Sequence, residues 1–255
     1  MIKVIINGIN GKMGKVLSNA VINTENMELA AGFDIYDDGK NECTVYKKPT
    51  DFKGEADVII DFSHPALLKD LLSYATETKT AVVVATTGLS EDEKNLMAEA
   101  SKKIAVFHSA NMSLGVNLLI DLVKQAANVL YENYDIEIIE KHHNQKIDAP
   151  SGTALMIADE ISAVLDNGMN YIYDRHSVRK KREKKEIGMH AVRGGTIVGE
   201  HEVIFAGKDE IISLNHLAMS KEIFATGSLR AAKFIADKEV GMYSMKDIFS
   251  ALQFG

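Results

Sequence analysis

The chain has 255 residues, of which 46% are hydrophobic and 25% are charged, and its formal net charge is −7. This composition excludes a disordered chain, and the acidic balance disfavours nucleic acid as the main partner. The single cysteine, Cys43, excludes an internal disulfide and a zinc site built on several thiolates, which predicts a reducing, cytoplasmic location. No apolar run approaches the ~18 residues of a membrane helix and no signal-peptide pattern is found, so no membrane partner is expected.

The first half of the chain alternates short β-branched runs with amphipathic helices. The runs are apolar on both faces, as in parallel strands that helices cover on both sides. Ser90 and Glu93 form the pattern of a capping box at the start of one helix. We therefore predict an α/β, doubly wound sheet with strands over residues 2–6, 29–33, 58–61, 81–85 and 104–107, and with helices over 12–23 and 91–102.

The pattern changes near Asn111 and predicts a second, α+β region with an open mixed or antiparallel sheet. We expect helices over residues 114–131 and from Ser151 to about 165. We expect strands over 135–140, 200–206 and 210–216, the last two joined by a turn at 207–209. The last ~35 residues are expected to be helical.

Residues 175–186 read RHSVRKKREKKE, and seven of the first eleven are Lys or Arg. The run is typical of a patch that binds nucleic acid or phosphate. A solvated, mobile loop is the alternative, and the acidic whole chain favours it. No function is assigned to the segment Arg175 to Lys185.

Three glycines, Gly8, Gly11 and Gly14, follow the first predicted strand with the spacing G-x-x-G-x-x-G. Glycines there let the backbone turn tightly and approach a pyrophosphate, which the N-terminus of the next helix favours. Asp34 lies 20 residues beyond Gly14 at the end of the second strand, where a carboxylate can accept hydrogen bonds from the adenosine ribose. A dinucleotide site is predicted; a plain βα turn with a surface aspartate remains the alternative.

Two further polar loops follow strands, at the edge of the sheet where ligands bind in open α/β folds. They are Ala85-Thr86-Thr87-Gly88 and Ser109-Ala110-Asn111-Met112. Both suit contact with a nicotinamide and its ribose, although each by itself could be a simple turn.

Residues 140–155 read EKHHNQKIDAPSGTAL and concentrate titratable groups. A metal site on His142, His143 and Asp148 is disfavoured, because adjacent residues of a strand point to opposite faces. A structural loop capped by Ser151 is a second interpretation. A third is an active site for an anionic substrate, in which a helix N-terminus and Lys146 bind a carboxylate and a histidine supplies a proton.

The motifs NGINGKMG, VIIDFSHP, VVVATTGLSEDEK, HSANMSLGVN, IEIIEKHHNQKIDAPSGTAL and HAVRGGTIVGEHEVIFAG together resemble the dihydrodipicolinate reductase family along the whole chain. The resemblance implies a Rossmann dinucleotide-binding domain of residues 1–112 and 229–255. It also implies a substrate-binding and oligomerisation domain of residues 113–228. A cytoplasmic homotetramer is expected, with reduction of 4-hydroxy-tetrahydrodipicolinate by NADH or NADPH and loss of water, in diaminopimelate and lysine biosynthesis.

The resemblance also implies roles for individual residues. His142 is expected to donate or accept a proton and Lys146 to act as the second acid, without a metal. Substrate is expected at His143, Ser151, Gly152 and Thr153. The cofactor is expected at Gly8, Ile9, Asn10, Gly11, Lys12, Met13, Asp34, Ala85, Thr86, Thr87, Ser109, Ala110, Asn111 and Met112.

Three departures from the family pattern concern the cofactor: Lys12 replaces an arginine, Ala85 replaces a glycine, and Ile35 replaces an arginine found in some members. Asp34 repels a 2′-phosphate and Ile35 offers it no charge, so NADH is expected to be preferred, with NADPH tolerated if Lys12 or Lys40 compensates. The alternatives are another two-domain Rossmann oxidoreductase acting on a small carboxylic acid and a non-enzymatic nucleotide sensor or nucleic-acid binder.

Overall fold

A computed structural model describes residues 1–37, 39–166 and 168–253. The chain forms two compact units, Met1–Ser113 with Lys221–Gly255 (unit 1) and Leu114–Ser220 (unit 2). The expected boundary at 228/229 lies inside helix α6 (Glu222–Ile235), whereas the observed boundary precedes this helix. The helix stays whole because its buried residues, including Ala225 and Leu229, pack within unit 1.

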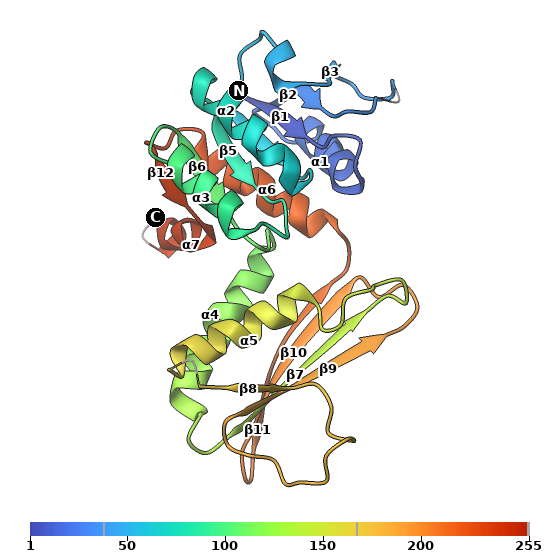
Figure 1. The fold of residues 1–255 in the computed structure, drawn as a ribbon, viewed down its shortest axis with the longest axis vertical. Coiled ribbons are helices and arrows are strands. Elements are labelled where there is room, and N and C mark those ends of the chain that lie inside the picture. Colours follow the sequence, from blue (N-terminus) through green and yellow to red (C-terminus); the bar gives the residue numbers. More distant parts are fainter. Residues whose placement is uncertain (38, 167, 254–255) are drawn as a thin grey trace. The chain divides into compact units, whose positions relative to one another are not determined.

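Unit 1 is built on a seven-stranded parallel sheet, as predicted for the first half of the chain (Figure 1). The chain runs from β1 outward to β2 and β3, and then returns to build β4, β5, β6 and β12 on the other side of β1. Ligands bind at such a reversal in doubly wound sheets. The strands are β1 (Ile2–Asn7), β2 (Met27–Phe33), β3 (Val45–Tyr46), β4 (Val58–Asp61), β5 (Ala81–Val84), β6 (Ala105–His108) and β12 (Gly241–Tyr243).

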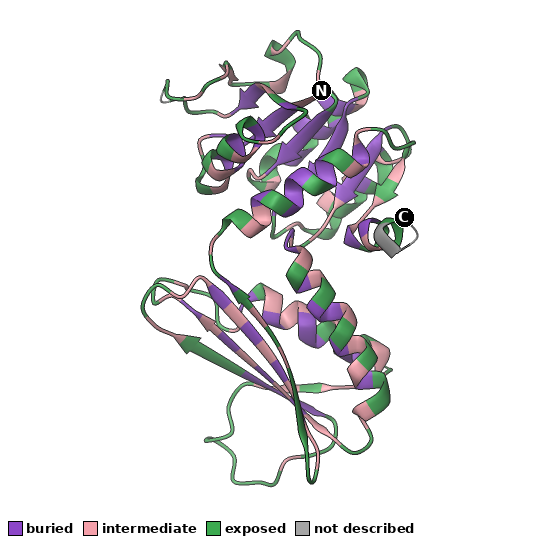
Figure 2. Ribbon diagram, turned by 180° about the vertical axis from the view of Figure 1, so that it is seen from behind, coloured by how far each residue is buried: buried purple, intermediate pink, exposed green. Residues whose placement is uncertain are grey.

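Helices cover both faces of this sheet, and its central strands are buried (Figure 2). Helices α1 (Lys12–Ile22) and α6 contact each other on one face, and α2 (Leu68–Thr78) and α3 (Glu91–Ala100) do so on the other. The capping box is confirmed, because the Ser90 hydroxyl accepts from the Glu93 N–H and the Glu93 carboxylate accepts from the Ser90 N–H. Two 3₁₀ turns, η1 (Pro49–Asp51) and η2 (Pro65–Leu67), and the terminal helix α7 (Met245–Gln253) complete the unit.

The expectation of an all-helical C-terminal stretch is wrong at β12. This strand pairs in parallel with β6, with Gly241 opposite Ala105. Three residues are too few to show a strand period in sequence. The neighbouring strand edge therefore decides its conformation.

Unit 2 contains an open mixed sheet in the order β11-β10-β7-β9-β8, which confirms the expected architecture. Strands β7 (Asp135–His142), β10 (Gly199–Ala206) and β11 (Ile211–Ala218) are antiparallel neighbours, whereas β7, β9 (Glu186–Arg193) and β8 (Asn170–Ile172) are parallel. Strand β7 is two residues longer than predicted, so His142 is part of the strand. The predicted turn also includes Glu210, whose carbonyl accepts from the Gly207 N–H.

Helices α4 (Leu114–Leu130) and α5 (Gly152–Val164) pack together and share a core with β7, β9 and β10. Among the described residues of unit 2, no helix covers the opposite face of the sheet, which exposes Val192, Ile211 and Leu217. Across the described ranges, no helix is long and apolar enough to cross a membrane.

The basic run is an exposed loop, as expected, but Arg175, Lys180 and Arg182 form ion pairs with carboxylates of the sheet, which the sequence did not predict. Arg175 lies 2.9 Å from a carboxylate oxygen of Glu137 and 2.7 Å from one of Glu186. Arg182 lies 2.9 Å from Asp135 and 3.1 Å from Glu137. Asp135 and Glu137 lie far from the run in the sequence, so only the tertiary structure brings these opposite charges together.

Candidate active site

The glycine loop connects β1 to α1 in unit 1, as predicted. Gly8 has a φ of +81°, a conformation that residues with a Cβ rarely adopt. A Cβ on Gly14 would lie 2.1 Å from the carbonyl oxygen of Gly8, so this close approach requires a glycine. Gly11 caps α1 without a side-chain hydrogen bond, which leaves first-turn N–H groups available to an anion. The loop therefore fits a pyrophosphate.

Asp34 directly follows β2, at the predicted place. Its carboxylate accepts hydrogen bonds from the N–H groups of Asn10, at 2.9 Å, and Tyr36, at 3.1 Å. Each carboxylate oxygen retains a lone pair for another donor, such as a ribose hydroxyl. The neighbouring Ile35 side chain is 73% exposed. These contacts couple the acid to the glycine loop and fit the adenosine end of a dinucleotide.

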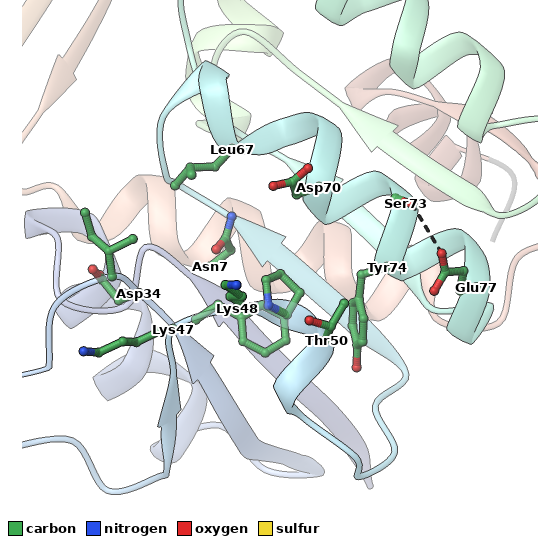
Figure 3. Close-up of a pocket in the computed structure, with 13 residues that line it drawn as sticks. Asn7, Asp34, Lys47, Lys48, Thr50, Leu67, Asp70, Ser73, Tyr74 and Glu77 are labelled. Atoms are coloured by element: carbon green, nitrogen blue, oxygen red, sulfur yellow. Dashed lines mark hydrogen bonds between the residues drawn. The ribbon is translucent and has the colours of Figure 1, made fainter.

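A cavity of about 300 Å³ adjoins Asp34 within unit 1 (Figure 3). Lys47 and Lys48 line it on the side of Asp34, while Asp70 and Glu77 of α2 line it on the other side. Sequence reasoning named Lys12 and Lys40 as possible partners of a 2′-phosphate and missed these two lysines. Nothing in the local sequence links them to Asp34, because the pairing of β2 with β3 brings them to this edge.

A buried carboxylate connects the ends of three neighbouring strands below the cofactor loops. Asp61, at the end of β4, accepts from the Asn7 amide of β1 and from the Thr86 hydroxyl after β5, each at 2.7 Å. The Ser63 hydroxyl donates to it at 2.6 Å. Complete burial raises the pKa of Asp61. The Thr86 hydroxyl also accepts from the Ser63 N–H, so its observed contacts position the loop from within.

The other predicted cofactor residues also lie at the carboxyl ends of parallel strands. Ala85 and Thr87 follow β5, and residues 109–112 follow β6, the next strand in the sheet. The Ile9 and Met112 side chains are buried, so their backbones are the groups left to meet a ligand. A Cβ on Gly227 of α6 would lie 1.7 Å from the Met112 carbonyl oxygen, so α6 holds this loop closely.

In unit 2, His142 ends strand β7 on the face covered by α5. Its Nδ1 lies 2.6 Å from Oε2 of Glu140, which is two residues earlier on the same face. Arg193 of β9 donates from both terminal nitrogens to the two oxygens of Glu140, at 2.7 and 2.6 Å. The Ser151 N–H donates to Oε1 at 3.0 Å. Glu140 is 1% exposed, so water makes almost no contact with its carboxylate.

These contacts set the charges of the pair. Burial alone would raise the pKa of Glu140, but the hydrogen bonds from Arg193 and His142 outweigh it and lower the pKa. Burial also lowers the pKa of His142, although the bond to Glu140 opposes this effect. Glu140 is therefore an ionised acceptor, and His142 titrates below its ordinary range.

A second histidine, His201, packs against the ring of His142. The ring of His201 of β10 contacts that of His142 edge to face, with 5.2 Å between centroids. Its Nε2 lies 2.9 Å from the Ser151 hydroxyl, which also accepts from the Ala154 N–H as the predicted cap of α5. Burial lowers the pKa of His201 to about 4, so it is neutral near pH 7. Ser151 is 1% exposed, and both contacts of its hydroxyl are internal.

The remaining predicted residues surround the N-terminus of α5. Lys146 lies 2.9 Å from the carboxylate of Asp148, which also accepts from the Gly152 N–H. The Lys146 ammonium and the Gly152 N–H, which were predicted to bind a substrate carboxylate, thus already contact the carboxylate of Asp148. Thr153 lies in the first turn of α5, and His143 directly follows β7. A substrate carboxylate that uses the Gly152 N–H must replace that of Asp148, whereas the Lys146 ammonium has three N–H donors and can contact both carboxylates.

Sequence reasoning missed Glu140, Arg193 and His201 as members of this cluster. Glu140 had a local signal, because it lies two positions before His142 and therefore on the same face of the strand. Arg193 and His201 had none, since strand pairing alone brings β9 and β10 beside β7. Among the described residues, no group of three His, Cys, Asp or Glu side chains is placed to hold a metal ion.

Comparison with known proteins covers both units. Family models for dihydrodipicolinate reductase match residues 2–112, as its N-terminus, and 115–249, as its C-terminus. A 4-hydroxy-tetrahydrodipicolinate reductase of Caldanaerobacter subterraneus is 52% identical over 252 residues, 97% of this chain and 98% of that protein. One of Clostridium novyi is 49% identical and covers 98% of this chain and 99% of its own length.

A solved structure shares the fold. It is a dipicolinate-bound dihydrodipicolinate reductase from Paenisporosarcina sp. TG-14, with a TM-score of 0.80 and 24% sequence identity. The match covers 96% of this chain and 97% of that protein. The likeness extends over both units.

Proposed function

The chain belongs to the dihydrodipicolinate reductase family, and from this premise we propose how its own residues carry out the family's reaction. It reduces 4-hydroxy-tetrahydrodipicolinate to tetrahydrodipicolinate with NAD(P)H and loss of water, a step of diaminopimelate and lysine biosynthesis. The observation that carries this conclusion is the 52% identity to a curated reductase along 97% of the chain.

Unit 1 binds the cofactor in this proposal. NAD(P)H supplies the hydride when it is bound. Residues 8–13 surround its pyrophosphate, and the N–H groups of Lys12 and Met13 in the first turn of α1 are the donors to it, because those of residues 8–11 donate within the chain. Asp34 accepts from the adenosine ribose. The loops at 85–87 and 109–112 hold the nicotinamide end, because they follow the next strands of the same sheet edge. Asp61 keeps the first of these loops in place through Thr86.

We propose that NADH is preferred over NADPH. Asp34 accepts from a 2′-hydroxyl but repels a 2′-phosphate, and Ile35 brings no positive charge. Lys47 and Lys48 line the adjoining cavity, so they, and not Lys12 or Lys40, are the cations that we expect to let NADPH bind at all.

Titration of both cofactors against one enzyme sample tests this preference. Lys47→Ala with Lys48→Ala should weaken NADPH several-fold and leave NADH unchanged. Tighter binding of NADPH than of NADH in the unaltered protein would reverse the proposed preference.

Unit 2 supplies the proton and binds the substrate. The substrate loses water to give a conjugated imine, and hydride and one proton then add to this imine. Protonated His142 transfers a proton from Nε2 to the ring carbon next to the one that receives hydride, and neutral His142 then regains a proton from solvent. Nε2 is suited to this step, because it forms no hydrogen bond within the described residues.

The substrate has two carboxylates, and the N-terminus of α5 offers donors for one of them. Lys146, the Gly152 N–H and Thr153 bind this carboxylate after Asp148 releases the Gly152 N–H. His143 contacts the substrate from the following loop, and Ser151 holds α5 and His201 in place. Binding of dipicolinate by the Paenisporosarcina reductase supports a planar dicarboxylate as the ligand class.

We also propose a homotetramer that assembles through the uncovered face of the unit 2 sheet. Val192, Ile211 and Leu217 expose apolar side chains there, which association would bury. Leu217→Glu should dissociate the assembly in analytical ultracentrifugation; an unchanged mass would reject this interface. A cytoplasmic location is proposed because NAD(P)H is an intracellular reductant.

The decisive assay follows NADH and NADPH oxidation with substrate generated freshly by the preceding synthase. Turnover is expected with both cofactors, and tetrahydrodipicolinate should accumulate in proportion to the cofactor oxidised. Cofactor binding without any turnover would instead favour a nucleotide sensor.

A further inference from the structure

The position of the His142 ring is determined by its neighbours on two strands, β7 and β10. Glu140 holds Nδ1 from β7, and the ring of His201 supports it from β10. A Cβ on Gly199 of β10 would lie 3.1 Å from Nε2, so the absence of a side chain there leaves room for this nitrogen. The ring thus has one nitrogen bound internally and one left for a ligand.

From this geometry we propose that Glu140 and Arg193 are positioning residues that fix His142 as the Nδ1–H tautomer and thereby reserve Nε2 for the substrate. The proposal rests on the proposed function in one respect, namely that His142 delivers the proton. Neither residue needs to touch substrate or cofactor for this role.

The donors and acceptors around His142 support the Nδ1–H tautomer. An ionised carboxylate only accepts hydrogen bonds, so the 2.6 Å contact with Oε2 requires a proton on Nδ1 of His142. Arg193 keeps the carboxylate ionised and prevents its rotation, because it contacts both oxygens. The Arg193 guanidinium is itself held, since Nη2 also donates to the Asp148 carbonyl at 2.6 Å.

Glu140 also sets the proton affinity of His142 against opposing influences. The charged or titratable groups around the ring are Glu140, Arg193, Lys146 and His201. Burial and the two cations lower the pKa of His142, and Glu140 raises it. Loss of the carboxylate should therefore leave less protonated His142 near pH 7 and move the decline of kcat to lower pH.

Glu140→Gln tests the proposal with an independent readout. The amide oxygen can take the place of Oε1, which accepts from Arg193 and Ser151, and this orientation turns the NH₂ group toward Nδ1 of His142. Histidine ¹⁵N chemical shifts, measured above the pKa and assigned with His142→Phe, should show Nδ1–H in the unaltered protein and Nε2–H in the variant. We expect kcat to fall by about 10²-fold, as for a histidine held in the wrong tautomer, with dicarboxylate binding retained.

Two variants complete the experiment. Glu140→Asp keeps an acceptor and should retain the Nδ1–H tautomer with a smaller loss of kcat. Glu137→Gln is the matched control, because Glu137 of the same strand also contacts a histidine, His190, at 2.7 Å and two arginines, but on the other face. It should change neither the His142 shifts nor kcat.

The outcomes separate this proposal from the function on which it rests. An Nδ1–H tautomer that persists in Glu140→Gln overturns the positioning role, whatever the activity. A switched tautomer with unchanged kcat overturns the role of His142 as proton donor. If Glu140→Gln does not fold, Arg193→Lys provides the test: a mixture of tautomers with about 10-fold lower kcat supports the proposal, and unchanged shifts and kcat reject it.

Discussion

On each face of strand β7 a glutamate contacts a histidine and at least one arginine, but the two clusters differ in their exposure to water. On the face toward α5, Glu140 contacts His142 and Arg193 and is 1% exposed. On the other face, the side chain of Glu137 is 22% exposed and contacts His190, whose side chain is 44% exposed.

The arginines that contact the two glutamates connect them to different parts of the chain. Arg193 holds the carboxylate of Glu140, which in turn contacts Nδ1 of His142, whereas Arg175 and Arg182 tie Glu137 to the basic run. Residue type therefore does not distinguish the two clusters, whereas burial and a histidine nitrogen left without a hydrogen bond among the described residues do.

The largest expected difference between the faces is catalytic. His142→Ala should lower kcat by about 10²–10⁴-fold with little change in KM, because it removes a general acid but not the carboxylate-binding groups. His190→Ala should leave kcat unchanged. Steady-state kinetics of both variants measure this contrast, and near-full turnover by His142→Ala would remove this residue from the mechanism.

The faces should also differ in acid stability. The pKa of His201 is about 4 in the folded protein, below the ordinary value of 6.5, so the unfolded chain binds more protons between these values. The free energy of unfolding should therefore fall as the pH drops from about 6.5 to 4, by about 3 kcal/mol from this group, and no further below 4.

Urea unfolding at several pH values measures this effect. His201→Gln keeps a polar group near Ser151 and should flatten the dependence, whereas His190→Gln should not. An equally steep profile in His201→Gln would assign the acid sensitivity to other groups.

On the outer face, the expected effect is on stability and not on turnover. Arg182 donates to the carboxylates of Asp135 and Glu137 and to the carbonyl of Ile136, which fastens the basic run to β7. Arg182→Met should lower the free energy of unfolding by about 1–3 kcal/mol, because the partly exposed carboxylates of Asp135 and Glu137 and the carbonyl of the buried Ile136 lose their donor.

Chemical denaturation tests this loss, with kcat expected to stay constant. Lys181→Met is the matched control, since Lys181 lies exposed in the same run and forms no ion pair with a described residue. Equal stability of the two variants would show that the run is not held through Arg182.

The smallest expected effect concerns ligand selectivity at α5. Thr153→Val keeps the side-chain shape and removes the hydroxyl, so it should weaken pyridine-2,6-dicarboxylate more than a pyridine monocarboxylate. The difference should be about 0.5–1.5 kcal/mol. Inhibition constants of both ligands measure it, and Thr153→Ser should restore the selectivity. Equal weakening of both ligands would place Thr153 away from the carboxylate.

Local sequence signals predicted the parts of the site that one βα unit or one helix end creates. Gly8, Gly11 and Asp34 were found because tight turns and strand ends restrict which residues fit. Ser90 and Ser151 were correctly identified as helix caps, since a cap bonds to a backbone group a few residues away. The family's motif carried the expectation for His142 and Lys146, whose roles stay predictions.

Contacts between distant segments were not predictable in this way. Lys47 reaches the cavity beside Asp34 through the pairing of β2 with β3, and Asp61 meets Thr86 through that of β4 with β5. The basic run was expected to be solvated, because its acidic partners, Asp135 and Glu137, lie about 40 residues away in sequence.

The sequence by itself determined the alternation of strands and helices, the glycine loop and the helix caps, because each depends on backbone conformation within a few residues. The tertiary structure alone decided which distant residues surround each of the two similar glutamates on β7. Strand pairing placed Arg193 and His201 on the buried face and left the cations of residues 175–185 to the other face. Burial then strengthened the electrostatic contacts of Glu140, and water weakens those of Glu137.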